Sequence, residues 1–131
     1  MTPRGIRNNN PLNIRRNPKN NWKGLKAEQT DRAFCQFEKM EYGIRAAYVL
    51  MMNYVKKGFD TPRKIIERWA PRNENNTDGY VKSVAMFLDV DKPLNNSIDY
   101  CRLAEAMAWA ETGRRLSNKL LTEAWYITFT N

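Results

Sequence analysis

Histidine is absent from the sequence, and cysteine occurs only twice. Without histidine, the Ser-His-Asp and Cys-His catalytic arrangements are excluded, and so are most zinc sites. Cys35 and Cys101 are too few and too far apart in sequence for a metal site or a disulfide framework, and we interpret them as reduced core thiols. Carboxylates must therefore carry out any proton transfer, and no cofactor is indicated.

Long apolar runs are also missing. No stretch approaches the roughly 18 apolar residues of a membrane span, so we expect no membrane insertion. Residues 1–7 are basic, but no apolar stretch follows them, as it does in a secretory signal. We therefore expect a protein that is made in the cytoplasm without a signal peptide and that stays there or leaves by another route.

Acidic residues are scarce relative to basic ones. The chain has 22 Lys and Arg against 14 Asp and Glu, a net charge of +8, which favours a polyanionic partner. Nucleic acid and the bacterial cell wall are both candidates. The basic residues are spread along the chain, and no helix-turn-helix, zinc knuckle or RNA-binding sheet motif is visible, so a nucleic-acid module is the weaker of the two.

The length of 131 residues and the hydrophobic content of 42% predict one domain over residues 1–131. Its pattern predicts a mostly α (α+β) fold with about five helices and a small irregular or β element near the N-terminus. Residues 1–37 are expected to be irregular or extended, with a short hairpin or three-strand patch around 12–15, 20–26 and 32–37. The apolar spacing predicts helices at about 42–57, 61–70, 77–88, 98–111 and 117–127.

Glu111 stands at the end of the apolar run "LAEAMAWAET". Helical spacing places it on the same face as Met107, and it falls in the last turn, where the helix dipole disfavours a carboxylate. Both placements raise a carboxyl pKa, as a general acid requires. We expect Trp109 or Trp125 to supply an apolar wall. The alternative is a glutamate that turns to water or pairs with one of the arginines that follow it.

The segment "RGIRNNNPLNIRR" is rich in asparagine, which tolerates left-handed backbone and offers both donors and acceptors. One interpretation is an ordinary turn with basic flanks. The other is a rigid loop that binds a neutral polar ligand such as an acetamido sugar. The candidate binding residues are Asn8, Asn9, Asn10 and Asn13.

Two further stretches carry candidates. Glu38 and Glu41 precede or begin a helix, where they either complement the helix dipole or supply a second carboxylate that orients water. In "RWAPRNENNTDGY", Trp69 and Tyr80 flank a polar loop that contains Glu74, Asn75 and Asn76. That loop is either a capped helix start or a sugar-contacting loop, and we regard Tyr42, Trp69, Tyr80 and Trp109 as candidates for stacking on sugar faces.

From Arg4 to about Asp91 the motifs "RGIRNNNPLNIR", "TDRAF", "EYGIRAAY", "RWAP" and "ENNT" resemble a family of small phage and prophage proteins. Members of that family are described as virion structural proteins or as lysozyme-like, peptidoglycan-degrading domains. The family's usual glycine in the asparagine motif is Leu12 here, so we expect a different turn at that point.

The order of the motifs is also similar to that of flagellar-type glucosaminidases of the lysozyme superfamily. There, a helix ending in Glu-Ser-x-x-Gly precedes the asparagine motif and a Trp-Gly pair. Here only seven residues precede Asn8, whereas a helix ending in Glu-Thr-Gly lies near the C-terminus. The resemblance implies a circularly permuted lysozyme-like domain, in which Glu111 lies beside the loop of residues 8–13.

The resemblance implies cleavage of peptidoglycan glycan strands, by a lysozyme, glucosaminidase or lytic transglycosylase mechanism. Glu111 would be the general acid. Glu41 or Glu38 would be the second carboxylate, unless one glutamate suffices, as in lytic transglycosylases. The protein would reach the wall after release, virion delivery or injection. The alternative is a non-enzymatic basic virion or assembly protein that binds cell wall or DNA.

Overall fold

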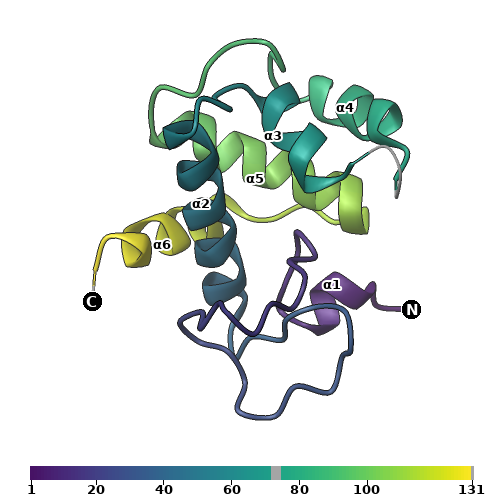
Figure 1. Ribbon diagram of the computed structural model, residues 1–131, viewed down its shortest axis with the longest axis vertical. Helices are drawn as coiled ribbons and strands as arrows, with labels where there is room; N and C mark the ends of the chain where they lie inside the picture. Colours follow the sequence, from purple (N-terminus) through teal and green to yellow (C-terminus); the bar gives the residue numbers. More distant parts are fainter. Residues whose placement is uncertain (72–74, 131) are drawn as a thin grey trace.

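The protein is mostly helical, which confirms the predicted fold class. The structure is a computed structural model that describes residues 1–71 and 75–130. The helices in this part of the chain are α1 (Arg4–Arg7), α2 (Met40–Lys56), α3 (Pro62–Trp69), α4 (Thr77–Ala85), α5 (Ser97–Thr112) and α6 (Asn118–Thr128). Figure 1 shows α2 running through the molecule, with the N-terminal segment at one of its ends and α3, α4 and α5 around the other.

Helices α2 to α6 correspond to the five helices predicted from the sequence, and their ends follow local capping rules. Thr61 and Asn76 each accept a hydrogen bond from a backbone N–H in the first turn of α3 and of α4. Pro62 follows Thr61 in the first turn of α3, where a backbone N–H has no partner within the helix and its absence costs no hydrogen bond. Gly113 ends α5 with a φ of 70°, which glycine adopts without strain.

The N-terminal segment differs from the prediction in two ways. Residues 4–7 form the single turn α1, which was expected to be irregular. The predicted hairpin or three-strand patch is reduced to two isolated bridges, Arg15 with Phe34 and Leu25 with Phe37. Side chains replace the missing ladder bonds: the Asn10 amide donates to the carbonyls of Ile14 and Cys35 at 3.0 and 2.9 Å.

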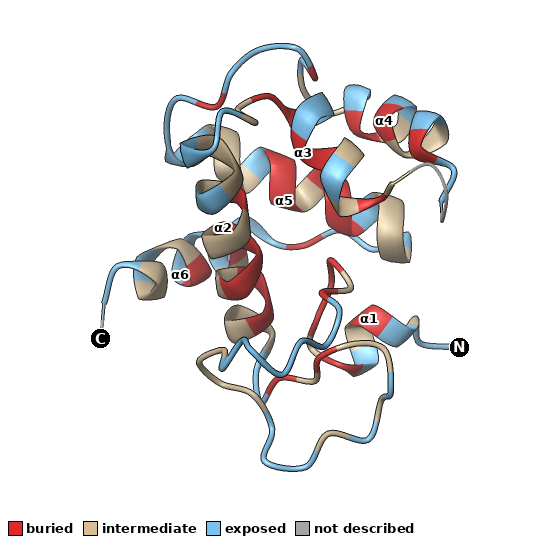
Figure 2. Cartoon of the chain, in the orientation of Figure 1, coloured by how far each residue is buried: buried red, intermediate tan, exposed pale blue. Residues whose placement is uncertain are grey.

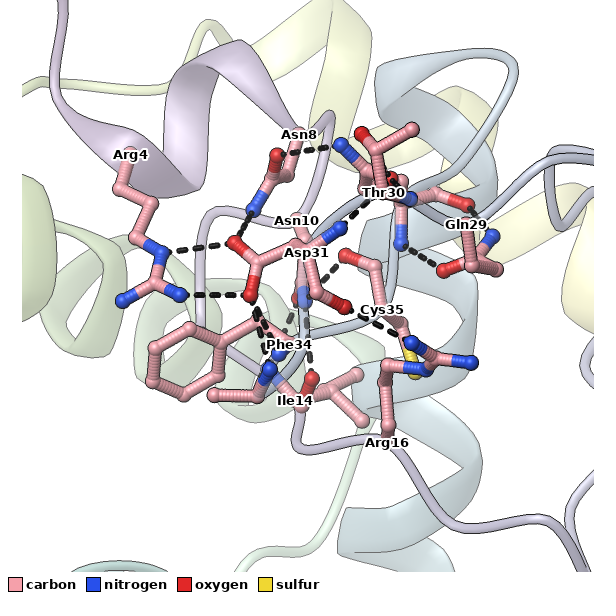
Figure 3. A network of polar contacts seen from close by, with 12 residues as sticks. Arg4, Asn8, Asn10, Ile14, Arg16, Gln29, Thr30, Asp31, Phe34 and Cys35 are labelled. Carbon is pink, nitrogen blue, oxygen red and sulfur yellow. Dashed lines mark hydrogen bonds and ion pairs between the residues drawn. The ribbon is translucent and has the colours of Figure 1, made fainter.

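Asp31 holds this segment together, as Figure 3 shows. Its carboxylate accepts two hydrogen bonds from the Arg4 guanidinium at 2.6 Å and one from the Asn8 amide at 3.0 Å. The backbone N–H groups of Ala33 and Phe34 donate to it at 2.9 and 3.0 Å. The Asp31 side chain is only 8% exposed. The three bonds from Arg4 and Asn8 fasten α1 and its C-cap to the loop that carries Asp31, and the other two order that loop.

Asp31→Asn is expected to lower the free energy of unfolding by about 1–3 kcal/mol at pH 7, because an amide cannot accept from all of these donors. The Arg4 guanidinium holds the pKa of Asp31 below its ordinary value of 3.8. The contribution of Asp31 is therefore present above pH 3.8 and is lost as the pH falls through its native pKa. Urea unfolding should show the difference between wild type and variant shrinking in acid, whereas Glu28→Gln, an exposed change in the same segment, should have little effect at any pH.

Gly43 lets the asparagine loop sit directly on α2. A Cβ at this position would lie 1.9 Å from the carbonyl oxygen of Asn9, which real side chains do not tolerate. Asn9 itself has a φ of 53°, the left-handed conformation that asparagine tolerates, and its side chain donates to the Phe37 carbonyl at 3.0 Å. The glycine in "EYGIRAAY" is thus explained by a backbone contact.

The core lies along α2, which packs against α5 and α6 (Figures 1 and 2). Ile44, Ala47, Tyr48 and Met51 are fully buried on this helix, at the spacing of one helical face. The Tyr48 hydroxyl satisfies its polar atom by bonding to the Leu121 carbonyl of α6 at 3.1 Å. The two ends of the chain lie on opposite sides of the molecule (Figure 1), and α5 rather than α6 lies against α1.

Candidate active site

A groove of about 370 Å³ lies between the N-terminal loop and helices α2, α3 and α5. Residues from separate parts of the chain line it. They comprise a carboxylate (Glu111), amides (Asn13, Asn17, Asn20, Asn75), arginines (Arg15, Arg16, Arg68), aromatic rings (Phe34, Tyr54, Trp69) and the smaller or apolar residues Ile14, Pro18, Leu50 and Ala70. Such a lining suits an elongated polar ligand with faces on which rings can stack.

Glu111 lies in the last turn of α5 and is held at both oxygens. The Asn13 amide donates to Oε1 at 3.0 Å, although the two residues are 98 positions apart in sequence. The Tyr80 hydroxyl donates to Oε2 at 3.0 Å. The two donors come from the N-terminal loop and from α4, so three distant parts of the chain fix the orientation of one carboxyl group.

The environment of Glu111 favours its protonated form. Burial raises the pKa of Glu111 above its ordinary value of 4.5, while the hydrogen bonds from Asn13 and Tyr80 and the charge of Arg15 oppose part of that rise. The arginines that follow α5 do not neutralise this carboxylate, because Arg115 pairs with Glu105 at 2.9 Å. A proton held by burial beside a groove is what a general acid requires.

The asparagine loop presents Asn13 to Glu111 through its backbone conformation. Asn13 has a φ of 51°, and its N–H donates to the Asn10 carbonyl at 3.0 Å. The Trp69 indole donates to the Leu12 carbonyl at 3.1 Å and ties the loop to α3. Positive φ values occur at Asn9 and Asn13 and not at Leu12, whose side chain is fully buried, so leucine is tolerated where the resembling family has glycine.

Three of the four candidate asparagines serve the loop itself. Asn10 is 0% exposed and Asn8 only 5%, so neither side chain can reach a ligand. Asn8 exchanges bonds with Asp31 and Gln36, and the amide of Asn9 is used by a backbone carbonyl. The burial of Asn8 and Asn10 corrects the prediction of ligand contact for these two residues. Asn9 bonds within the turn and does not line the groove, whereas Asn13 does.

The candidate second carboxylates do not line the groove. Glu41 lies in the first turn of α2, whereas Leu50 and Tyr54 of the same helix line the groove. The rise along a helix separates Glu41 from Leu50 by about 14 Å. Glu38 lines a different hollow, beside Lys26 and Gln36. The structure thus gives no support to either as Glu111's partner and fits the alternative for Glu41, in which an acid complements the helix dipole.

The aromatic and loop candidates divide into two groups. Trp69 and Asn75 line the groove, and Tyr80 contributes its hydroxyl to Glu111 rather than an open ring face. Tyr42 does not line the groove, and its ring packs against Gly24 instead.

The structure also corrects the expectations for Trp109, Trp125 and Asn76. Trp109 is 39% exposed and lies about 200° around α5 from Glu111, so it faces away from the site. Trp125 packs against Tyr48, so neither tryptophan supplies the expected apolar wall. Asn76 caps α4, which is the alternative interpretation, and Glu74 lies outside the described residues.

The arginines of the groove were not predicted from the sequence as binding residues. Arg15 and Arg16 directly follow the asparagine motif, and Arg68 precedes Trp69. Their position next to the asparagine motif and to Trp69 could have indicated a role in binding. However, basic residues spread along a sequence do not show which of them lie together in the fold. In the residues that the structure describes, no group of three His, Cys, Asp or Glu side chains is placed to hold a metal ion.

Part of the chain is similar to a curated phage protein. No family model matches the sequence. Protein P5 of Pseudoalteromonas phage PM2 is 41% identical to the chain over 85 residues. The matched residues make up 63% of this chain and 53% of that protein, so the chain spans about half the length of the curated relative. The chain is thus similar to a phage protein, which supports the phage character expected from its motifs. Among the described helices, none has the length and apolar character needed to cross a membrane.

Tyr80→Phe is expected to raise the pKa of Glu111 further, because the hydroxyl that favours the ionised carboxylate is removed. The carboxyl carbon of Glu111, followed by NMR over a pH titration, measures this directly. Tyr126→Phe removes a hydroxyl from an exposed residue of α6 and serves as the control. An unchanged or lower Glu111 pKa in Tyr80→Phe would mean that the hydroxyl does not act on the carboxylate.

Proposed function

We propose that the protein cleaves the β-1,4 glycan strands of peptidoglycan, with Glu111 as the general acid. The observation that carries the proposal is a half-buried carboxyl group with a raised pKa, held by Asn13 and Tyr80, in a groove lined by amides and aromatic rings. A raised carboxyl pKa suits protonation of a sugar leaving group near neutral pH. The net charge of +8 favours attraction to the anionic wall.

In this mechanism the Glu111 carboxyl donates its proton to the glycosidic oxygen as the bond to the leaving sugar breaks. Asn13 and Tyr80 then stabilise the carboxylate that remains, because both donate hydrogen bonds to it. Glu111 is the only acidic residue among the described residues that line the groove. This favours the route that needs one glutamate over routes with a second carboxylate. In that route a hydroxyl of the sugar itself attacks the anomeric carbon as the glycosidic bond breaks, and its proton passes to the Glu111 carboxylate.

The contact between Glu111 and Asn13 is the one that a permuted lysozyme-like domain requires. It supports that arrangement as part of the proposal. The helix that supplies the acid is α5, and the two ends of the chain lie on opposite sides of the molecule. The permutation proposed here is therefore that α5 takes the place of the family's first helix, without the two chain ends lying side by side. Similarity to a phage protein favours a protein that reaches the wall after release or from a virion.

Digestion of purified peptidoglycan, with mass spectrometry of the soluble products, tests the proposal. We expect release of disaccharide units by the wild-type protein. Products that end in a 1,6-anhydro sugar indicate the one-glutamate route, and reducing ends indicate hydrolysis. Absence of any glycan product under conditions in which the protein is folded and binds the wall would contradict the proposal.

The second candidate is a non-enzymatic protein that binds the wall or DNA. The three arginines in the groove favour this candidate, because they suit any polyanion. Salt-sensitive binding of a DNA duplex, without release of glycan products, would support it over cleavage.

A further inference from the structure

Positive charge is concentrated in the groove, because three arginines and only one carboxyl group belong to its described lining. Arg15 and Arg16 line it from the N-terminal loop, and Arg68 lines it from α3. The Arg16 guanidinium donates to the backbone carbonyl of Asp31 at 2.9 Å. Arg15 lies over the Phe34 ring at 5.3 Å, and Arg68 lies over the Phe59 ring at 3.6 Å. All three are exposed, so their remaining N–H donors are accessible to a ligand.

Three arginines outside the groove form ion pairs with carboxylates. Arg4 pairs with Asp31, Arg63 with Asp91 and Arg115 with Glu105. None of the arginines in the groove has an ion-pair partner among the described residues. The described groove lining has one carboxyl group, that of Glu111, against these three guanidinium groups, and the charge of Arg15 acts on it.

We propose that Arg15, Arg16 and Arg68 form a carboxylate-binding subsite beside Glu111, which selects glycan strands bearing carboxylates over neutral glycans. This inference rests on the proposed function, because it assigns the substrate class of the same groove. Guanidinium groups bind carboxylates through paired N–H bonds, and the strands of peptidoglycan carry carboxylates on their peptide substituents. A neutral chitin-type strand would leave the three charges without partners.

Binding to an inactive protein tests the subsite without turnover. In the Glu111→Gln background, calorimetry would compare a soluble peptidoglycan tetrasaccharide with free peptide carboxylates, the same fragment after amidation of its carboxylates, and chitotetraose. Replacing all three arginines by Gln is expected to weaken binding of the first fragment by about tenfold, or about 1.4 kcal/mol. The amidated fragment and chitotetraose should change by less than about twofold, which is under about 0.5 kcal/mol.

A matched control separates the subsite from net charge. Lys82→Gln, Arg114→Gln and Lys119→Gln together remove the same charge from exposed positions outside the groove. Equal weakening by this control, or equal affinity of the native and amidated fragments, overturns the subsite. If the triple variant is poorly folded, Arg15→Gln alone replaces it, because this side chain is exposed. It should also weaken binding of the carboxylate fragment, by less than the triple variant.

The outcomes distinguish this inference from the proposed function. Arginine-dependent binding of the carboxylate fragment without any cleavage by the wild type supports the subsite and contradicts the cleavage. Cleavage that depends on Glu111 but is equally fast on native and amidated strands supports the function and overturns the subsite. Tighter arginine-dependent binding of a single-stranded oligonucleotide than of the glycan fragment also overturns it, because the groove would then select nucleic acid.

Discussion

Glu111→Gln is expected to reduce glycan cleavage by about 10²- to 10⁴-fold, the usual contribution of a general acid. Glutamine has nearly the same shape and can keep both contacts. Its carbonyl oxygen accepts from Asn13, and its NH₂ group donates to the Tyr80 hydroxyl, whose own hydrogen can turn toward the Met107 carbonyl at 3.5 Å. The variant therefore loses the transferable proton but keeps the shape of the side chain and its contacts with Asn13 and Tyr80. Product release from purified peptidoglycan, quantified by mass spectrometry, measures the loss.

Glu123→Gln is the control for this variant, because Glu123 is an exposed glutamate on α6, outside the groove. It should cleave at the wild-type rate. Cleavage by Glu111→Gln at more than about a tenth of the wild-type rate would contradict the assignment, since a lost general acid costs more than that.

The stability of Glu111→Gln at different pH values checks that the variant is folded. Because burial raises the Glu111 pKa above 4.5, folding is favoured by the protonated carboxyl below pH 4.5, and this contribution is lost as the pH rises through the native pKa. The neutral amide has no such loss. We expect the variant to melt at the same temperature as the wild type or higher at pH 7, and a clearly lower melting temperature would show that the substitution disturbs the fold.

Gly43→Ala is expected to have the largest effect on stability, a loss of about 3 kcal/mol. The new methyl group would meet the carbonyl oxygen of Asn9, and backbone cannot turn aside as a flexible side chain can. Either α2 or the asparagine loop must move. Since that loop carries Asn13 to Glu111, cleavage should fall together with stability. Urea unfolding and peptidoglycan digestion measure the two effects.

Gly79→Ala is the matched control, also a glycine within a helix. The nearest atom to a Cβ there belongs to the Asn76 side chain, which can rotate away at the cost of its capping bond from the Gly79 N–H. The helical preference of alanine, about 1 kcal/mol over glycine, offsets much of that cost. Similar losses of stability in the two variants would show that the close contact with the Asn9 carbonyl is not the reason for glycine at position 43.

The helices could be predicted from the sequence because their signals are local. Apolar spacing, the capping residue Thr61 and the terminal Gly113 act within a few residues of where they stand. The predicted strand patch failed because spaced apolar residues do not reveal whether a ladder or side-chain amides will satisfy the backbone. Asn10 performs that task here, and the turn α1 depends on Asp31, a residue distant in sequence.

The position of Glu111 on an apolar helix face could also be read locally, and the resemblance placed it beside the asparagine loop. Which other residues converge on it could not be read in that way. Trp109 is near Glu111 in sequence but faces away, whereas Tyr80 reaches it from α4. Arg15 and Arg68 meet at the groove from the loop and from α3, two segments that the Trp69–Leu12 hydrogen bond joins.

The proposed cleavage requires a proton on Glu111, and burial favours that proton by raising the pKa of the carboxyl group. The most direct test compares the pKa of the Glu111 carboxyl, from an NMR titration, with the alkaline limb of the pH profile of glycan cleavage. Both should give the same pKa, above 4.5, since cleavage by a general acid is lost as its proton dissociates. A carboxyl that ionises at or below pH 4.5 while cleavage continues at neutral pH would contradict the account.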